Sequence, residues 1–194
     1  LIVNADDFGL TSGINRAVIE LHNAGVLDSA TLMAVSPRFD EAVTLAKQHG
    51  SLGVGCHIVL VDGVSAADPP SVSSLLNPTG NSNQPGFRPT LGAFVRDLFL
   101  GRILRTDIER ETTAQILRLQ HAGISVTHID THKHTHMFPA VLDAVTRAAA
   151  ACGVHTIRNP FEPAWSVRAT PDPAPVRMLQ VRFLSRFRNY FLRL

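Results

Sequence analysis

Cysteine and long apolar runs are both scarce in this sequence of 194 residues. The two cysteines, Cys56 and Cys152, are too few for a disulfide framework, and their spacing matches no Cys-x-x-Cys metal or redox motif. We therefore expect both to be small buried side chains. No stretch approaches the ~18 apolar residues that a membrane span needs, and no basic segment followed by an apolar one opens the chain. These features predict a protein of the reducing cytoplasm.

An excess of one charge is also missing. The chain has 18 Lys and Arg against 16 Asp and Glu, a net charge of +2. Proteins that bind nucleic acid through its phosphates are far more basic, so nucleic acid is not an expected partner. The charge is uneven, because residues 173–194 hold five arginines and no acid, and subtracting these from +2 leaves −3 on residues 1–172. We expect a mildly acidic body and a basic end.

A helical pattern that stops at a glycine and continues into a β-rich run occurs four times, at Gly25, Gly50, Gly123 and Gly153. Glycine adopts the left-handed conformation at a helix C-terminus without a Cβ penalty. The expected helices cover residues 12–24, a segment capped by Ser36 with Pro37 at its first position, 107–122 and 139–152, and the expected strands cover 1–5, 30–35, 54–60, 126–129 and 154–158.

This alternation predicts an α/β fold with a mostly parallel sheet, either open or closed into a barrel. A barrel would be short, because complete eight-stranded barrels usually need ~250 residues. Hydrophobic residues make up 45% of the chain, which is typical of a globular protein, and the length fits one domain. We therefore predict a single domain over residues 1–194.

Residues 62–90 interrupt the alternation with a stretch rich in Pro, Ser, Asn and Gly that has neither helical nor strand periodicity. A long irregular segment inside a domain is usually a functional lid or an insertion. We predict a loop that faces the substrate, and a solvated insertion is the alternative.

The basic end, residues 177–194, has the pattern of an amphipathic helix. Phe183, Phe187 and Phe191 recur at i, i+4 and i+8, and arginines occupy much of the remainder. Such a helix either packs its aromatic stripe on the core or rests on an anionic membrane surface. The second alternative makes a peripheral membrane contact a candidate.

The densest group of functional side chains lies in residues 127–136. Every second position there is His or Asp, namely His128, Asp130, His132, His134 and His136. On an extended segment alternate side chains share a face, so we expect these five to point to one side. Converging imidazoles and a carboxylate suit a divalent transition metal or a proton-transfer site. A His-rich surface strand is the alternative.

Two weaker signals lie at other strand ends. Asp6 and Asp7 close the first expected strand, where α/β folds place their sites, although a turn with a helix cap has the same pattern. His57 lies in an otherwise apolar run, where a lone histidine is more often a core residue. With the histidine cluster, three strand ends each offer a ligand. His, His and Asp with open positions is the arrangement that a hydrolytic metal requires.

These motifs together resemble a known family. The Asn-Ala-Asp-Asp-Phe-Gly near the N-terminus, the Gly-x-His on a middle strand and the Thr-His-x-Asp-x-His-x-His-x-His followed by Met-Phe-Pro are similar to those of the YdjC-like carbohydrate deacetylases, the ChbG/HpnK family. The Leu-Val-Asp-Gly after His57 and the Pro- and Ser-rich loop favour the hopanoid-biosynthesis-associated branch, HpnK. The resemblance implies a distorted (β/α) barrel akin to polysaccharide deacetylases, and hydrolysis of an N-acetyl group on a sugar or glycolipid.

The resemblance also implies roles for single residues. Asp7, His57 and His132 match the family's metal ligands, and Asp6 matches its proposed catalytic base. Arg158 would hold a sugar hydroxyl. The candidates for substrate contact or for support of the metal ligands are Phe8, Asp130, His134, His136 and Arg158.

The implied chemistry agrees with the residue types. A metal polarises the acetamide carbonyl and its bound water, and a carboxylate takes the proton as that water attacks. Neighbouring strand residues face opposite ways, so Asp6 and Asp7 share a site only because the strand ends there. Mixed nitrogen and oxygen ligands admit Zn, Mn, Co or Ni, and the resemblance adds Mg. We expect one divalent metal ion, with magnesium and zinc preferred.

The sequence departs from the family at its far end. Members are usually longer and carry a further histidine, in a His-Pro-Gly-like context, that resembles the general acid for the leaving amine, and no such residue precedes Leu194. We expect a C-terminal segment beyond this chain, because five or six strands leave a barrel incomplete and its edges exposed. A homodimer is the expected assembly. A metallophosphoesterase, which generally uses two metals, and a non-catalytic sugar- or metal-binding module are the alternative functions.

Overall fold

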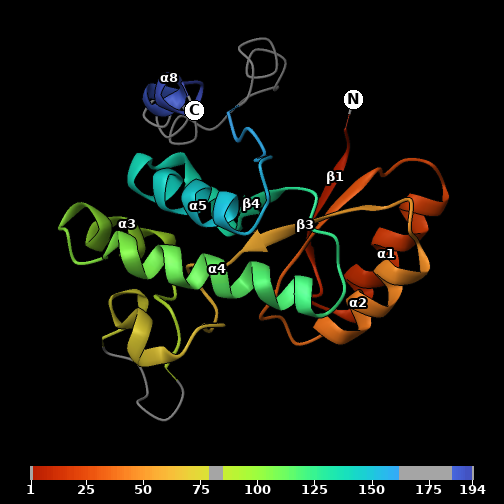
Figure 1. Cartoon of the computed structure of the whole chain (residues 1–194), viewed down its shortest axis with the longest axis horizontal. Coiled ribbons are helices and arrows are strands. Elements are labelled where there is room, and N and C mark those ends of the chain that lie inside the picture. Colours follow the sequence, from red (N-terminus) through yellow and green to blue (C-terminus); the bar gives the residue numbers. More distant parts are fainter. Residues whose placement is uncertain (1, 79–84, 162–184, 194) are drawn as a thin grey trace, which may run out of the picture.

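Four parallel strands form the centre of the molecule (Figure 1). The structure is a computed structural model that describes residues 2–78, 85–161 and 185–193. The strands follow one another across the sheet in chain order, β1-β2-β3-β4, and every neighbouring pair is parallel. Their bounds are β1 (Asn4–Phe8), β2 (Ser29–Leu32), β3 (Gly53–Ile58) and β4 (Ile129–Thr131). This arrangement confirms the predicted α/β class with a parallel sheet.

Helices lie between the strands along the chain. They are α1 (Ser12–Asn23), α2 (Phe39–Gln48), α3 (Leu91–Phe99), α4 (Arg105–His121) and α5 (Pro139–Ala151). Three expected helices match α1, α4 and α5 within two residues at each end. The prediction for α2 was wrong in its cap: the helix begins at Phe39 after Arg38, and the Ser36 hydroxyl instead donates to the Met33 carbonyl at 2.8 Å. Helix α3 was not predicted.

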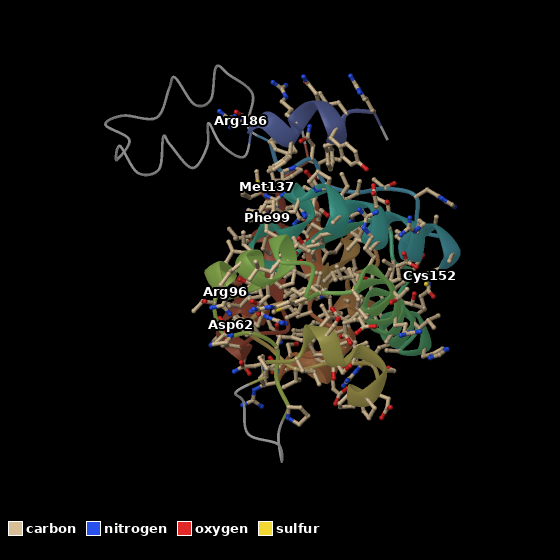
Figure 2. All side chains as sticks on the ribbon, turned by 90° about the vertical axis from the view of Figure 1, so that its left-hand side faces the viewer. Asp62, Arg96, Phe99, Met137, Cys152 and Arg186 are labelled. Atoms are coloured by element: carbon tan, nitrogen blue, oxygen red, sulfur yellow. The ribbon has the colours of Figure 1, made fainter. Side chains whose placement is uncertain are left out.

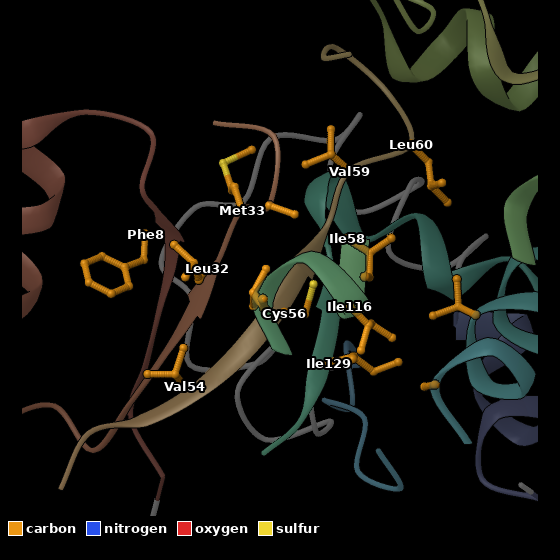
Figure 3. Close-up of a cluster of buried hydrophobic side chains, with 14 of the residues drawn as sticks. Phe8, Leu32, Met33, Val54, Cys56, Ile58, Val59, Leu60, Ile116 and Ile129 are labelled. Atoms are coloured by element: carbon orange, nitrogen blue, oxygen red, sulfur yellow. The ribbon is translucent and has the colours of Figure 1, made fainter. Parts of the chain in front are cut away.

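The two faces of the sheet differ in polarity, because side chains alternate along each strand. One face is apolar and packs under the helices; its buried side chains include Phe8, Leu32, Val54, Cys56, Ile58 and Ile129 (Figure 3). The other face carries the polar side chains of Asn4, Asp6, Ser29, Thr31, His57, His128 and Asp130. A sheet with consecutive strand order, helices on one face and polar side chains on the other is the wall of a barrel rather than a doubly wound sheet.

The fifth expected strand, 154–158, is reduced to one parallel bridge between Ile129 and Ile157. Two backbone hydrogen bonds flank it, from Ile129 N to the Thr156 carbonyl at 2.9 Å and from Arg158 N to the Ile129 carbonyl at 3.0 Å. This short pairing is sufficient to fix the backbone of Arg158 beside β4. Of the two cysteines, Cys56 is fully buried as expected, whereas Cys152 is partly exposed.

Residues 62–90 are more ordered than predicted, apart from 79–84, which lie outside the described residues. They contain the 3-10 helix η1 (Pro69–Leu75) and two antiparallel bridges, Val64 to Gly86 and Leu76 to Phe87. Buried apolar side chains from this segment, such as Val72, join the main core. The sequence did not predict this local structure, because the spacing of these apolar residues follows no single period.

Buried charges attach this segment to the helices. Arg88 Nε donates to Asp97 Oδ2 of α3 at 2.7 Å, and both side chains are almost fully buried. The carboxylate of Glu111 in α4 accepts from the backbone N–H groups of Ala66 and Ala67 at 2.8 and 3.1 Å. Because these backbone groups have buried partners, the segment is held at the rim of the sheet instead of extending into solvent.

The described part of the basic end folds back on the body. It contains η3 (Ser185–Phe187) and α8 (Arg188–Phe191), while 177–184 and Leu194 of the expected helix lie outside the described residues. The Phe187 ring lies 6.1 Å from that of Phe138, and the Phe191 ring lies 5.7 Å from that of Phe161. Figure 2 shows Arg186 on this segment at one end of the molecule. These contacts favour the alternative in which the aromatic residues pack on the core.

Within the described residues, no helix combines the length and the apolar character needed to cross a bilayer.

Candidate metal centre

An irregularity in β1 brings Asp6 and Asp7 to the same site. Ala5 pairs with Ala30 and Phe8 with Leu32, so β1 has one residue more than β2 between these pairs, which is a β-bulge. Asp7 adopts a left-handed conformation with a φ of 60°. The bulge turns the Asp7 side chain to the polar face that Asp6 already occupies. The predicted reason, an ending strand, was wrong, because the bulge lies within β1.

The turn after this bulge is fixed by a buried asparagine. Gly9 has a φ of 96°, and a Cβ there would lie 2.5 Å from the Ser36 hydroxyl, so the position requires glycine. The Gly9 N–H donates to Asn15 Oδ1 at 2.8 Å, and Asn15 is fully buried in α1. Asn15 thus ties the end of β1 to the first helix.

His57 is held by a carboxylate from the next strand. His57 on β3 pairs in register with Asp130 on β4, so both side chains lie on the polar face. The distance from His57 Nδ1 to Asp130 Oδ1 is 2.6 Å, and both side chains are almost completely buried. Because the carboxylate accepts a hydrogen bond from Nδ1–H, Nε2 is the ring nitrogen that faces away from it, toward Asp7. This contact agrees with the prediction that Asp130 supports a metal ligand through a hydrogen bond.

His132 reaches the same point from the 3-10 segment η2 (His132–Met137). The expectation that the whole cluster forms an extended strand was wrong, because β4 ends at Thr131 and Lys133 and His134 have φ values of 54° and 52°. Side chains after His132 therefore do not alternate between two faces. The structure brings His132 to Asp7, buries His136 and leaves His134 exposed.

Asp7, His57 and His132 form a compact set of three donors. Asp7 Oδ1 lies 3.3 Å from His57 Nε2 and 3.2 Å from His132 Nδ1, and the two nitrogens are 3.3 Å apart. Ligand atoms at about 2.1 Å from one ion are about 3.4 Å apart in a tetrahedron and about 3.0 Å apart at adjacent octahedral positions. The donor spacing fits either geometry.

Asp7 Oδ1 provides a second test of the fit. This oxygen is buried, yet it accepts no hydrogen bond from any of the described residues. Its nearest polar neighbours are the two imidazole nitrogens, 3.3 and 3.2 Å away, so a proton on one of them or a cation shared with them must satisfy it. The residues present therefore fit a divalent cation.

The ionisation of these groups has clear physical causes. Burial lowers the pKa of His57, but Asp130 and then Asp7 outweigh it and raise that pKa to about 9. The imidazoles of His132 and His57 hold the pKa of Asp7 well below its usual range, although burial opposes them. When no cation is bound, the His57 ring is therefore protonated on both nitrogens, and it lies between the carboxylates of Asp130 and Asp7. Metal binding requires the Nε2 lone pair, so it would release that proton.

Asp6 lies beside the donor set with one oxygen engaged. Its Oδ1 accepts from Arg158 Nη1 at 2.6 Å and from Asn4 Nδ2 at 2.9 Å. Within the described residues no hydrogen bond reaches Oδ2, and about a third of the side chain is exposed. Asp6 therefore has one restrained oxygen and one available oxygen.

The remaining predicted site residues differ in their burial and in their contacts. Phe8 is fully buried in the core, so its side chain has no surface with which to touch a substrate. His136 Nε2 lies 3.1 Å from the Arg158 carbonyl, and burial lowers the pKa of His136 to about 4. Arg158 contacts Asp6 and also Asp130 Oδ2 at 3.3 Å, a pairing that the sequence interpretation as a sugar contact had missed.

Two polar residues behind the site were also missed. Thr31 is buried, lies 3.3 Å from His57 Nδ1 and donates to Asp130 Oδ2 at 3.3 Å. Asn4 holds Asp6 as described above. The available signal was the alternation of polar residues on the first two strands, where Asn4 and Asp6, and Ser29 and Thr31, stand two apart.

With this geometry established, the chain was compared with known proteins. A family model described as YdjC-like protein matches residues 1–189. The chain belongs to the YdjC-like family. Relatives within it include proteins named carbohydrate deacetylase from Brevibacillus brevis, 42% identical over 149 residues, and Geobacillus stearothermophilus, 43% identical over 148 residues. The alignments cover 77% and 76% of this chain but 55% of each relative, so the chain spans about half of their length.

The fold of this chain is also seen in a solved structure. A crystal structure from Enterococcus faecalis, described as that of a proposed cellobiose-phosphate cleavage protein, superposes with a TM-score of 0.70 at 24% sequence identity. The match covers 94% of this chain and 64% of that chain. This likeness supports the predicted fold class, a deacetylase-like distorted (β/α) barrel.

Proposed function

We propose that this chain carries the metal site and the catalytic base of a carbohydrate N-deacetylase, a hydrolase that removes an acetyl group from an N-acetylated sugar. The observation that carries the proposal is the donor set of Asp7, His57 and His132 with Asp6 beside it. The names of the relatives from Brevibacillus brevis and Geobacillus stearothermophilus support the same activity.

Each side chain has a distinct task in this proposal. Asp7, His57 and His132 hold one divalent cation, which when bound polarises the acetamide carbonyl and makes water more acidic. Asp6 Oδ2 accepts the proton of the attacking water. Arg158 neutralises part of the Asp6 charge and fixes its Oδ1. Asp130 keeps the His57 proton on Nδ1, which leaves Nε2 for the cation.

The types of donor atom in the set favour some cations over others. Two imidazole nitrogens and one carboxylate suit zinc, whereas magnesium prefers oxygen ligands and keeps several waters. We keep both zinc and magnesium as candidates, because the resemblance to deacetylases implies magnesium. Within the described residues one group of three such ligands is present, which supports a single-metal hydrolase over a two-metal phosphoesterase.

Finer assignments remain predictions. We propose one deacetylase-like domain over residues 1–194, with 62–90 as a structured rim segment, and an acetylated sugar or glycolipid as substrate. The hopanoid-associated branch, the cytoplasmic location, the homodimer and the peripheral membrane contact rest on the sequence alone.

Acetate release from a panel of N-acetylated sugars tests the proposed activity. We expect the protein to release acetate, to lose that activity after chelation and to regain it with zinc or magnesium. His132→Ala should abolish the regained activity, while His155→Ala, a change at an exposed histidine, should not. Ligand binding without acetate release under every metal condition would identify a non-catalytic binding module instead.

A further inference from the structure

The polar face of the sheet continues below Asp6 as a chain of hydrogen bonds. Asn4 Nδ2 donates to Asp6 Oδ1 at 2.9 Å and contacts Thr31 Oγ1 at 3.3 Å. On its other side Asn4 Oδ1 lies 3.2 Å from His128 Nε2. His128 Nδ1 lies 2.8 Å from Thr127 Oγ1. A series of four side chains from β1 and from the segment before β4 therefore ends at the proposed base: Thr127, His128, Asn4 and Asp6.

The direction of this chain follows from chemistry. The Asp6 carboxylate only accepts hydrogen bonds, so the amide nitrogen of Asn4 must face it and the amide oxygen must face His128. That oxygen needs a donor, which places the His128 proton on Nε2. Burial lowers the pKa of His128, in agreement with a neutral ring that carries one proton. The hydrogen bonds therefore run from His128 through Asn4 to Asp6.

A close contact with Gly55 independently supports the position of the His128 ring next to Asn4. A Cβ at Gly55 would lie 2.6 Å from both Cε1 and Nε2 of the His128 ring and 2.7 Å from the His128 carbonyl oxygen. Any other residue at this position of β3 would displace the ring from Asn4. The glycine of the Gly-x-His motif thus makes room for the ring two residues away from the metal ligand His57.

The space beside these residues explains why Asp6 needs such support. A cavity of about 620 Å³ is lined by Asn4, Ser29, His128 and Arg158, among others. The Asp6 side chain, which contacts two of these residues, is itself about a third exposed. Its orientation therefore depends on hydrogen bonds rather than on packing.

The geometry points to Asn4 and His128 as positioning residues for Asp6: His128 holds the Asn4 amide, and Asn4 and Arg158 occupy Oδ1, so that Oδ2 is the oxygen presented to the attacking water. This inference rests on the proposed deacetylase function. It assigns a role to the first residue of the Asn-Ala-Asp-Asp motif and to His128, which lies outside the donor set. Neither residue contacts the reacting atoms, so both act through Asp6.

Steady-state kinetics on the full-length protein, with the sugar that wild type cleaves best, tests the inference. Asn4→Leu and His128→Leu should lower kcat by about 10- to 100-fold, while KM and metal affinity stay within about two-fold of wild type. His128→Gln places an amide N–H near the position of Nε2 and should restore most of kcat. His155→Leu, an exposed histidine, is the matched control and should leave kcat unchanged.

The outcomes distinguish a failure of the positioning role from a failure of the proposed deacetylase function. An activity that Asp6→Asn abolishes but that Asn4→Leu and His128→Leu leave unchanged would overturn the positioning role alone. A loss of kcat matched by an equal loss of bound metal, or one that His128→Gln does not restore, would also overturn it in favour of a structural role. A metal-loaded wild type that releases no acetate from any sugar would overturn the deacetylase function and the inference with it.

Discussion

Arg158 Nη1 lies 2.6 Å from Asp6 Oδ1 and 3.3 Å from Asp130 Oδ2. Asp6 is the proposed base, and Asp130 supports the proposed ligand His57. One guanidinium therefore connects the group that accepts a proton with the group that orients a metal ligand. The backbone pairing of Arg158 beside Ile129 fixes the position from which it makes both contacts.

Replacing Arg158 distinguishes this role from a direct sugar contact. Arg158→Met removes a hydrogen bond to a charged group, worth about 1.5–3 kcal/mol, so we expect kcat to fall by about 10- to 100-fold with KM little changed. Measurement of kcat and KM separately decides the matter. A rise in KM at constant kcat would instead support the original prediction that Arg158 holds a sugar hydroxyl.

Removing the support behind His57 should weaken metal binding. Asp130→Asn replaces the carboxylate that lies 2.6 Å from His57 Nδ1, and we expect metal affinity to fall by about 10- to 100-fold. Titration against a competing chelator measures the change. Asp62→Asn, at an exposed carboxylate that pairs with Lys133, is the control and should leave affinity unchanged. Equal affinities in both variants would contradict the assigned role of Asp130.

His136 should make the fold sensitive to acid. Its pKa is lowered from 6.5 to about 4 by burial, so between these values the unfolded chain binds a proton that the folded protein does not. Stability is therefore unaffected above pH 6.5 and falls as the pH drops toward 4. At pH 4.5 this effect destabilises the fold by about 2–3 kcal/mol.

Denaturant unfolding at pH 8 and pH 4.5 checks this prediction. His136→Gln keeps an N–H group for the Arg158 carbonyl but does not titrate in this range. The wild type should lose about 2–3 kcal/mol more than this variant between the two pH values. Equal losses would show that His136 does not titrate across the folding transition.

Gly55 should tolerate no side chain. In Gly55→Ala the new Cβ would lie 2.7 Å from the His128 carbonyl oxygen, a backbone atom that cannot rotate away. We expect a loss of about 1–3 kcal/mol in the free energy of unfolding. Gly50→Ala is the matched control, because a Cβ there meets nothing within 4 Å. Urea midpoints that agree between the two variants would contradict the tight approach of His128 to β3.

Local patterns in the sequence predicted much of the fold. The helices that end before Gly25, Gly123 and Gly153 were placed correctly, and these glycines have φ values of 69°, 81° and 76°. The strands were located by their apolar runs, but the predicted bounds of β1, β2 and β4 were wrong by up to three residues. The order within 62–90 depends on buried charges such as Glu111, which accepts a hydrogen bond from Ala66 N, 45 positions away in the sequence. Single-sequence periodicity contains no information on those contacts.

The residue types at three strand ends predicted which side chains form the donor set. They did not predict its geometry. Period-two alternation predicted that His134 and His136 would join His132, but left-handed conformations at Lys133 and His134 end that pattern. The bulge at Asp7 is equally invisible, because it depends on pairing with β2. The partners of Asp6, namely Asn4 and Arg158, are 154 positions apart in the sequence and meet through the sheet.

The proposed function depends most on separate roles for Asp6, the base, and for the three metal ligands Asp7, His57 and His132. Metal content and acetate release measured on the same preparations of wild type and Asp6→Asn test it directly. We predict that Asp6→Asn keeps about one divalent ion per chain, because Asp7, His57 and His132 are intact, while acetate release falls by about 10²- to 10⁴-fold. Undiminished acetate release by metal-loaded Asp6→Asn, on a substrate that the wild type cleaves, would contradict the account.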